Sequence, residues 1–325
     1  MTDWPITFEE VLAARERLRP HIAPTPLRAY AELDSAVGCG IRLRVKHENF
    51  QPTGAFKVRN GLSALSALSP DERQRGVVAA TRGNHGLGLA WAGQRLGVPV
   101  TVCVPVGNNL EKNAAVRALG ARLVEQGGDY DESVLVAQRL ARDEGLRLVH
   151  STNDRSVVAG AGTLTLELLE EEPALDALVL SVGGGSQAVG ALTVVRALRP
   201  GVRVYGVQAA GASAMHDAWH LGRPVSKPTA ETFADGLATR NTYPFTFGAL
   251  REGLAGFVTV TDAQIAEAVR LVLSTTHTLV EGAGAAGLAG LVTLRETLAG
   301  RTVGIVLSGA NIDRATLARV LTGEL

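Results

Sequence analysis

Four loops in this sequence carry residues that could do chemistry, and one of them places a lysine beside an aromatic ring. Lys57 follows Phe56 directly, in a loop that also contains Gly54. A lysine amine can form a Schiff base with an aldehyde cofactor. The neighbouring ring of Phe56 would help to desolvate the amine and so to depress its pKa. Because most lysines are solvated surface residues, this interpretation needs a second feature.

A second loop, residues 183–186 with the sequence GGGS, has the composition of a phosphate site. It follows an apolar run at residues 177–182 and precedes a helix-like stretch at residues 187–198. Glycines let backbone N–H groups converge and a helix N-terminus adds positive potential, which favours a phosphate over a purely structural turn. The spacing differs from G-x-G-x-x-G, and Gln208 stands where a ribose-binding acid would be expected, which disfavours a dinucleotide. No Gly-Lys-Ser/Thr follows, which excludes a P-loop.

The histidines do not predict a metal site. His216 and His220 are four residues apart and could share one face of a helix. Neither the glutamate of a metalloprotease helix nor a third ligand accompanies them, so we expect a surface face and no metal. His85 differs because it lies inside the turn at residues 83–86, next to the expected ligand site. No G-x-S-x-G elbow is present, so a Ser-His-Asp triad is not indicated.

The order of the elements predicts a fold that would bring these loops together. Apolar strand-like runs alternate with helix-like stretches, which is typical of α/β proteins with doubly wound sheets. Ligands bind at the carboxyl ends of the strands in such sheets, where the turns at Gly83, Gly183 and Ser308 lie. Residues 227–256 show little periodicity and predict a long irregular connection. The expected strands are 41–46, 77–81, 98–104, 121–125, 177–182, 202–207 and 302–307, and the expected helices are 7–18, 87–96, 111–119, 131–143, 187–198 and 263–274.

Composition excludes several classes of partner. The formal net charge is zero, so no electrostatic argument favours nucleic acid or an anionic membrane. No apolar run is long enough to span a bilayer. Residues 1–5 carry an acid and a proline where a signal peptide would carry basic and apolar residues. Cys39 and Cys103 lie far apart and suggest no disulfide framework. We therefore expect a cytoplasmic protein that binds neither nucleic acid nor membrane.

Taken together, the loops resemble those of a known enzyme family. Residues 52–59 (PTGAFKVR) look like the lysine motif of the serine/threonine dehydratases, or threonine ammonia-lyases, within the tryptophan-synthase-β-like (fold type II) pyridoxal-phosphate enzymes. His85 and Val58-Arg59 differ from the threonine and Asp-Arg typical of the cysteine-synthase branch. The similarity runs in order from about Pro24 to the end, which makes it more specific than any single motif. The other similar segments are 83–86 (GNHG), 183–186 (GGGS), 234–236 (ADG), 281–284 (EGAG) and 308–313 (SGANID).

The resemblance implies two doubly wound open-sheet domains and a set of residue roles. Residues 1–60 and 151–325 would form the large cofactor-binding domain, and residues 61–150 the small substrate-side domain. Lys57 would hold pyridoxal 5'-phosphate and then take the α-proton of the substrate. Ser308 would face the pyridine nitrogen and leave it largely unprotonated, which favours prompt loss of a β-hydroxyl group. The implied cofactor-binding residues are Phe56, Lys57, Asn84, Gly183, Gly184, Gly185, Ser186, Glu281 and Ser308, and the implied substrate-binding residues are Arg82, Gly83, Asn84 and His85.

The implied activity is a dehydration followed by deamination. A β-hydroxy amino acid such as threonine, serine or a bulkier relative would give a 2-keto acid and ammonia, and the enzyme would be a homodimer or a higher homo-oligomer. Three alternatives stay open: a phenylserine or hydroxyectoine-pathway dehydratase, an amino-acid racemase on the same scaffold, and a phosphate-binding module without covalent chemistry.

Departures from the family pattern narrow these expectations. Arg82 stands where the serine racemases have a serine, and a guanidinium cannot readily accept a proton, so we expect elimination with little racemisation. Gln208 replaces a metal-binding glutamate of some members, so we expect no divalent metal. Ser186 replaces a common fourth glycine. The chain ends soon after Ser308 without a regulatory extension, which suggests a catabolic or specialised enzyme.

Overall fold

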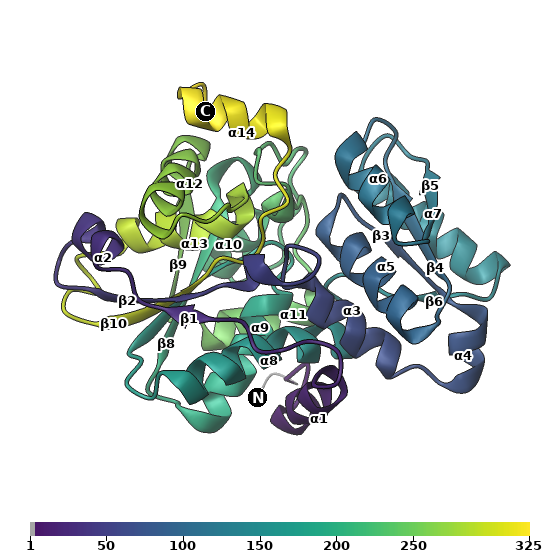
Figure 1. Ribbon diagram of the computed structural model, residues 1–325, viewed down its shortest axis with the longest axis horizontal. Helices are drawn as coiled ribbons and strands as arrows, with labels where there is room; N and C mark the ends of the chain where they lie inside the picture. Colours follow the sequence, from purple (N-terminus) through teal and green to yellow (C-terminus); the bar gives the residue numbers. More distant parts are fainter. Residues whose placement is uncertain (1–3) are drawn as a thin grey trace.

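Two separate, mostly parallel sheets make up the protein, as Figure 1 shows for the computed structural model. The structure describes residues 4–325, so the expectation of no signal peptide falls mainly on residues outside it. The larger sheet has the strand order β1-β2-β10-β7-β8-β9 and the smaller one β5-β4-β3-β6. Both alternate with helices along the chain, so the predicted α/β class is confirmed.

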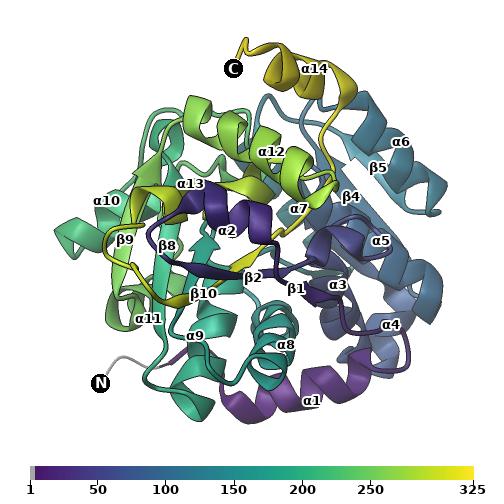
Figure 2. The same cartoon turned by 60° about the vertical axis from the view of Figure 1, so that its left-hand side comes forward.

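The larger sheet is parallel except for its edge strand β1. The central strands are buried along nearly their whole length, as expected for a sheet covered on both faces. Helices α8 (Arg155–Glu171) and α9 (Ser186–Leu198) lie on one side of it, and α12 (Asp262–Thr276) and α13 (Gly282–Thr293) on the other (Figure 2). Its strands are β1 (Leu27–Arg28), β2 (Arg42–Lys46), β7 (Ala177–Ser181), β8 (Arg203–Ala209), β9 (Gly256–Val260) and β10 (Thr302–Val306).

The smaller sheet is parallel throughout and contains the predicted strand–helix–strand unit. Strand β3 leads into helix α5 (Asn84–Leu96), which returns to β4 beside it. Helix α7 (Tyr130–Asp143) packs against β3 and β4 through a separate apolar cluster, and α6 (Leu110–Ala118) lies beside α5. The strands are β3 (Val77–Ala80), β4 (Val100–Val104), β5 (Arg122–Glu125) and β6 (Arg147–Leu148).

The protein has two halves, one built around each sheet, and helix α3 (Lys57–Ser66) packs against both of them. Because α3 begins at Lys57, this packing positions the predicted cofactor-binding lysine. The helix approaches α5 so closely that a Cβ on Gly61 would lie 2.3 Å from the carbonyl oxygen of Gly88. On its other side the buried guanidinium of Arg59 pairs with Glu48 at 2.8 Å and with Glu167 at 2.6 Å. Since α3 packs against both halves, the domain division at residues 60 and 150 stays a prediction.

Two sequence expectations about local structure were wrong. Lys57 was expected in a loop, but it is the first residue of α3, whose Gly and Asn residues weaken the helical signal. Residues 227–256 were expected to be irregular, but they contain α11 (Pro244–Gly253), a short helix that starts at a proline and buries only one narrow face. The remaining helices are α1 (Phe8–Leu18), α2 (Ala31–Val37), α4 (Pro70–Arg75), α10 (Ala214–Leu221) and α14 (Arg314–Thr322). Among residues 4–325, no helix combines the length and apolarity that a membrane span requires.

Candidate active site

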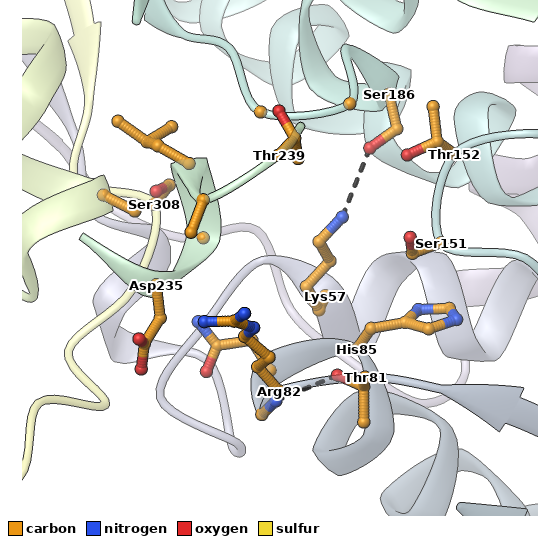
Figure 3. Close-up of a pocket in the computed structure, with 18 of the residues that line it drawn as sticks. Lys57, Thr81, Arg82, His85, Ser151, Thr152, Ser186, Asp235, Thr239 and Ser308 are labelled. Atoms are coloured by element: carbon orange, nitrogen blue, oxygen red, sulfur yellow. Dashed lines mark hydrogen bonds between the residues drawn. The ribbon is translucent and has the colours of Figure 1, made fainter. Parts of the chain in front are cut away.

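A pocket lies between the two sheets, and all of the predicted site residues line it. Most of them come from the loops that follow β3, β7 and β10 and from the segment that leads into α3, as expected for the carboxyl ends of parallel strands. Glu281 instead lies just before helix α13. Figure 3 shows Lys57 extending toward Ser186, with Ser308 and Asp235 on the opposite side of the pocket from His85. The predicted residues in the lining are Phe56, Lys57, Arg82, Gly83, Asn84, His85, Gly183, Gly184, Gly185, Ser186, Glu281 and Ser308.

The Lys57 amine is half-buried and only weakly held. Its Nζ donates to Ser186 Oγ at 3.3 Å and lies 4.7 Å from the centre of the Phe56 ring. Burial lowers the pKa of Lys57 to about 8, and Glu281 opposes this shift without cancelling it. A substantial fraction of the amine is therefore neutral near pH 8, which is the form that attacks an aldehyde or accepts a proton.

The loop at residues 183–186 forms a cradle that side chains would fill. A Cβ on Gly183 would lie 2.3 Å from the carbonyl oxygen of Gly236, and one on Gly184 would lie 2.1 Å from Thr152 Oγ1. Gly185 has a φ of 97°, a conformation that favours glycine. The loop ends at the N-terminus of α9, whose first N–H groups lack intrahelical partners. Open backbone and a helix N-terminus suit a phosphate, so the cradle fits the phosphate of pyridoxal phosphate.

Asn84 is held in the pocket by two other loops. Its Nδ2 donates to Glu281 Oε1 at 2.6 Å, and its Oδ1 accepts from Asn311 Nδ2 at 2.7 Å. Burial raises the pKa of Glu281 to about 7, although Lys112 and the bond from Asn84 oppose the rise. One N–H of the Asn84 amide stays available for a polar atom of a bound cofactor, such as the ring oxygen of pyridoxal phosphate.

Ser308 closes the pocket at the end of β10. Only 6% of the residue is exposed. Its carbonyl oxygen accepts a hydrogen bond from the N–H of Phe56 at 2.9 Å, which ties the end of the strand to the residue before Lys57. The loop carrying the serine and the segment carrying the lysine are therefore positioned relative to each other by backbone contacts. The role of the Ser308 hydroxyl toward the cofactor nitrogen stays a prediction.

The turn before α5 can bind a carboxylate. The helix begins at Asn84, three residues earlier than expected, so its first N–H groups lack intrahelical partners and belong to residues that line the pocket. His85 is buried beside the pocket, and its Nε2 donates to the carbonyl oxygen of Val149 at 3.1 Å. Burial and the nearby Lys57 lower the pKa of His85 to about 3, so the ring is neutral and adds no charge.

Several lining residues were not predicted, although three of them share a signal with those that were. Lys112, Tyr130 and Thr152 each lie within nine residues after a strand of the smaller sheet, namely β4, β5 and β6. Applying the strand-end rule to every strand of this sheet would have found them. Tyr243 also lines the pocket, but it comes from the segment that was interpreted as irregular, and no pattern marks it.

One of these residues forms an ion pair across the pocket. Lys112 Nζ of α6 lies 2.5 Å from Asp235 Oδ2, on the opposite side of the interface between the two halves. The Lys112 side chain passes over Gly83, where a Cβ would lie 2.8 Å from Lys112 Cδ. The charge of Lys112 is thus already compensated by the protein. The sequence predicts no role for Asp235, although residues 234–236 belong to a segment that resembles the family.

The position at which the family resemblance implies a metal-binding glutamate in some members carries an amide side chain here. Gln208 is fully buried, and its Oε1 accepts from the N–H of His216 at 2.9 Å. The rings of His216 and His220 contact each other at 4.4 Å, and neither lines the pocket. Within the described part of the chain, no three His, Cys, Asp or Glu side chains are grouped so that they could hold a metal ion.

Activity should therefore survive removal of divalent metals. The Gln208 amide has no charge to attract a hard cation, and its oxygen is already occupied by a backbone N–H group. We expect less than a twofold change in kcat/KM after dialysis against EDTA, measured as keto-acid release. A large loss that magnesium or calcium restores would contradict this prediction.

Loading of the cofactor should depend on pH through Lys57. The neutral amine is the reactive form, and its fraction rises with pH. Because burial lowers the pKa of Lys57 to about 8, the rate should rise up to about pH 8 and then flatten. The measurement is the recovery of visible absorbance when apoenzyme is mixed with pyridoxal phosphate at different pH values. A rate that keeps rising toward pH 10 would show that Lys57 has an ordinary pKa.

The comparisons with known proteins agree with this site. The family described as "Pyridoxal-phosphate dependent enzyme" matches residues 18–309, and the chain belongs to that family. It is 37% identical to L-threonine ammonia-lyase of Geobacter sulfurreducens over 97% of this chain and 78% of the relative. It is 32% identical to L-threo-3-hydroxyaspartate ammonia-lyase of Saccharomyces cerevisiae over 98% and 97% of the two chains. Maize serine racemase has a TM-score of 0.92, with 27% identity over 99% of this chain and 98% of that one.

Proposed function

We propose that this protein is a pyridoxal-phosphate-dependent ammonia-lyase that converts a β-hydroxy amino acid into a 2-keto acid and ammonia. The observation that carries the proposal is the half-buried amine of Lys57, whose pKa is lowered and which lies within one pocket with a glycine cradle and a helix N-terminus. These three features match an aldehyde, a phosphate and a carboxylate. Relatives at 32% and 37% identity are named as ammonia-lyases, which supports the same activity.

The residues of the chain have separate tasks in this reaction. The cofactor, when bound, supplies an aldehyde that captures the substrate amine and a conjugated ring that accepts electrons from the α-carbon. The glycine cradle and Asn84 hold it, and the N-terminus of α5 orients the substrate carboxylate. Lys57 accepts the α-proton and becomes the ammonium that can protonate the departing β-hydroxyl, so that water leaves. The released enamine tautomerises to an imine, and water hydrolyses it to the keto acid and ammonia.

Ser308 should decide how readily the β-hydroxyl is lost. A neutral hydroxyl beside the pyridine nitrogen leaves that nitrogen unprotonated, whereas a carboxylate would favour its protonation. A Ser308→Asp variant should therefore eliminate water about tenfold or more slowly and show a long-wavelength absorption band that the parent lacks. Ser308→Thr keeps the hydroxyl and serves as the control. An aspartate variant with parental turnover and an unchanged spectrum would contradict the role of Ser308.

The activity is tested by offering the holoenzyme L-threonine, L-serine, L-threo-3-hydroxyaspartate and L-threo-phenylserine, and measuring keto acid and ammonia together. Equal amounts of both products from at least one of them are expected. Absence of keto acid from the whole panel would contradict the proposal. The same panel covers the phenylserine alternative, since an apolar substrate would then give the highest kcat/KM.

The racemase alternative is favoured by the structural similarity to maize serine racemase. It requires a base on each face of the α-carbon. Lys57 serves one face, but Arg82 stands where a serine would serve the other, and a guanidinium does not accept protons at neutral pH. D-Serine should therefore form at less than about a tenth of the rate of pyruvate, as followed by chiral chromatography. Comparable rates would favour the racemase.

Three further expectations belong to this proposal, and they concern the cellular compartment, the metabolic role and the oligomeric state. Cys39 and Cys103 are both free, which is compatible with a reducing compartment such as the cytoplasm. A catabolic role fits the release of ammonia from an amino acid. A homodimer or higher homo-oligomer stays a prediction, and size-exclusion chromatography with light scattering would test it.

A further inference from the structure

Arg82 is a cation in the pocket whose charge the protein does not compensate. It lies in the turn between β3 and α5, and its guanidinium forms no ion pair or hydrogen bond with the part of the chain that the structure describes. Its Nε is buried and has no partner. A buried donor without a partner costs stability, and a charge near it costs more unless a ligand supplies the partner.

The other basic groups of the pocket already have partners or tasks. Lys112 pairs with Asp235 at 2.5 Å. Lys57 is the residue proposed to bind the cofactor covalently. Arg240, just outside the lining, pairs with Asp129 at 3.1 Å and also with Asp131. Arg82 is therefore the pocket cation that is free to bind an anionic group of a substrate.

The α-carboxylate of the substrate does not need Arg82. The N-terminus of α5 offers backbone N–H groups for it, and these start two residues after Arg82. An amino acid bound there would direct its β-substituent to other parts of the same lining. Arg82 also borders the outer cleft that adjoins the pocket, so it would meet an anionic substrate on entry as well as in the pocket.

The surroundings of Arg82 are polar. Tyr130 is close enough for the Arg82 charge to act on its hydroxyl, and although burial raises the pKa of Tyr130 overall, Arg82 opposes that shift. The Tyr130 hydroxyl lies 3.4 Å from Ser151 Oγ. This end of the pocket offers a guanidinium and two hydroxyls, which suits a carboxylate and fits a methyl or phenyl group poorly.

We infer that the preferred substrate is a β-hydroxy amino acid with a second carboxylate on its β-carbon, and that Arg82 is the residue that selects it. The guanidinium forms a bidentate pair with the distal carboxylate, while the amides of α5 hold the α-carboxylate. This inference rests on the proposed ammonia-lyase activity and specifies its substrate class. Neutral substrates such as threonine would leave Arg82 unpaired and would bind more weakly.

The first test measures binding without turnover. Succinate and butyrate have the same chain length but differ in one carboxylate, and their affinity for the holoenzyme can be measured by calorimetry. Succinate should bind roughly 10- to 100-fold more tightly, as expected for a charge-assisted pair. Arg82→Gln should abolish most of this preference, and Arg82→Lys should retain only part of it. Arg95→Gln removes an exposed arginine from the far end of α5 and should leave the preference intact.

The second test compares kcat/KM for L-threo-3-hydroxyaspartate and L-threonine in the parent and in Arg82→Gln. The parent should prefer the dicarboxylate, and the variant should lose roughly 10- to 100-fold of that ratio, mainly through KM. If the parent deaminates threonine with equal or greater efficiency and binds succinate no better than butyrate, the inference is wrong while the ammonia-lyase activity stands. If no substrate yields keto acid, the proposed function fails, and the succinate measurement still decides the role of Arg82.

Discussion

Replacing Lys57 with alanine should lower kcat by about 10⁴-fold or more, because one side chain provides both the covalent link and the proton acceptor. The cradle at residues 183–186 does not depend on this amine, so the variant should still bind pyridoxal phosphate reversibly. The measurement pairs single-turnover kinetics with the absorbance of bound cofactor after gel filtration. The variant should lose the cofactor on filtration, while the parent retains it.

A matched lysine shows whether this loss is specific. Lys227 has a side chain that is 37% exposed, and it pairs with Asp217 away from the pocket. Lys227→Ala should keep kcat within twofold of the parent. Added methylamine should restore part of the activity of Lys57→Ala, since a small amine can occupy the vacated space. A Lys57→Ala variant with more than a hundredth of parental kcat would contradict the assignment.

Adding one methyl group to the phosphate cradle should weaken cofactor binding about 100-fold. In a Gly184→Ala variant the new Cβ would lie 2.1 Å from Thr152 Oγ1, so either the loop or Thr152 must move. The displaced loop would no longer present its N–H groups to a phosphate, and charge-assisted hydrogen bonds would be lost. The dissociation constant of pyridoxal phosphate, measured by titrating apoenzyme, should rise while the melting temperature of the apoenzyme changes little.

A second substitution distinguishes a local collision from general destabilisation. Thr152→Ala removes the hydroxyl that the new methyl group would meet, so Gly184→Ala combined with Thr152→Ala should recover part of the cofactor affinity. Gly201 provides the neutral control, because a Cβ there would meet nothing within 4 Å. Gly201→Ala should leave cofactor affinity unchanged. If Gly184→Ala binds the cofactor as tightly as the parent, residues 183–186 do not hold its phosphate.

The sequence predicted the loops that line the site better than it predicted the helices and contacts that hold these loops in place. The cradle at 183–186 and the turn at 83–86 follow strongly apolar strands, and their backbone N–H groups at helix N-termini suit anionic groups. Residues 183–186 and residues 83–85 line the pocket. The helix that begins at Lys57 was missed because α3 is held by close packing on α5 and α8 and by the buried pairs of Arg59, which have no signature in local periodicity.

Contacts that join the two halves could not be predicted at all. The Lys112–Asp235 pair connects residues 123 positions apart, and each is unremarkable in its own segment. Asn311 likewise reaches Asn84 from a loop 227 residues away. Such pairs depend on how the two sheets are oriented, and neither hydrophobic patterning nor a motif encodes that orientation. For the same reason, the sequence could not predict that Arg82 lacks an ion-pair partner. Only the assembled pocket shows that no carboxylate of the described chain reaches its guanidinium.

Chemical reduction of the holoenzyme tests the central claim most directly. Borohydride fixes the cofactor on whichever lysine carries it, and peptide mapping by mass spectrometry then identifies that residue. The account predicts loss of the visible band and a single modified peptide labelled at Lys57. A label on Lys46 or Lys112, or an unlabelled protein that still turns over substrate, would contradict it.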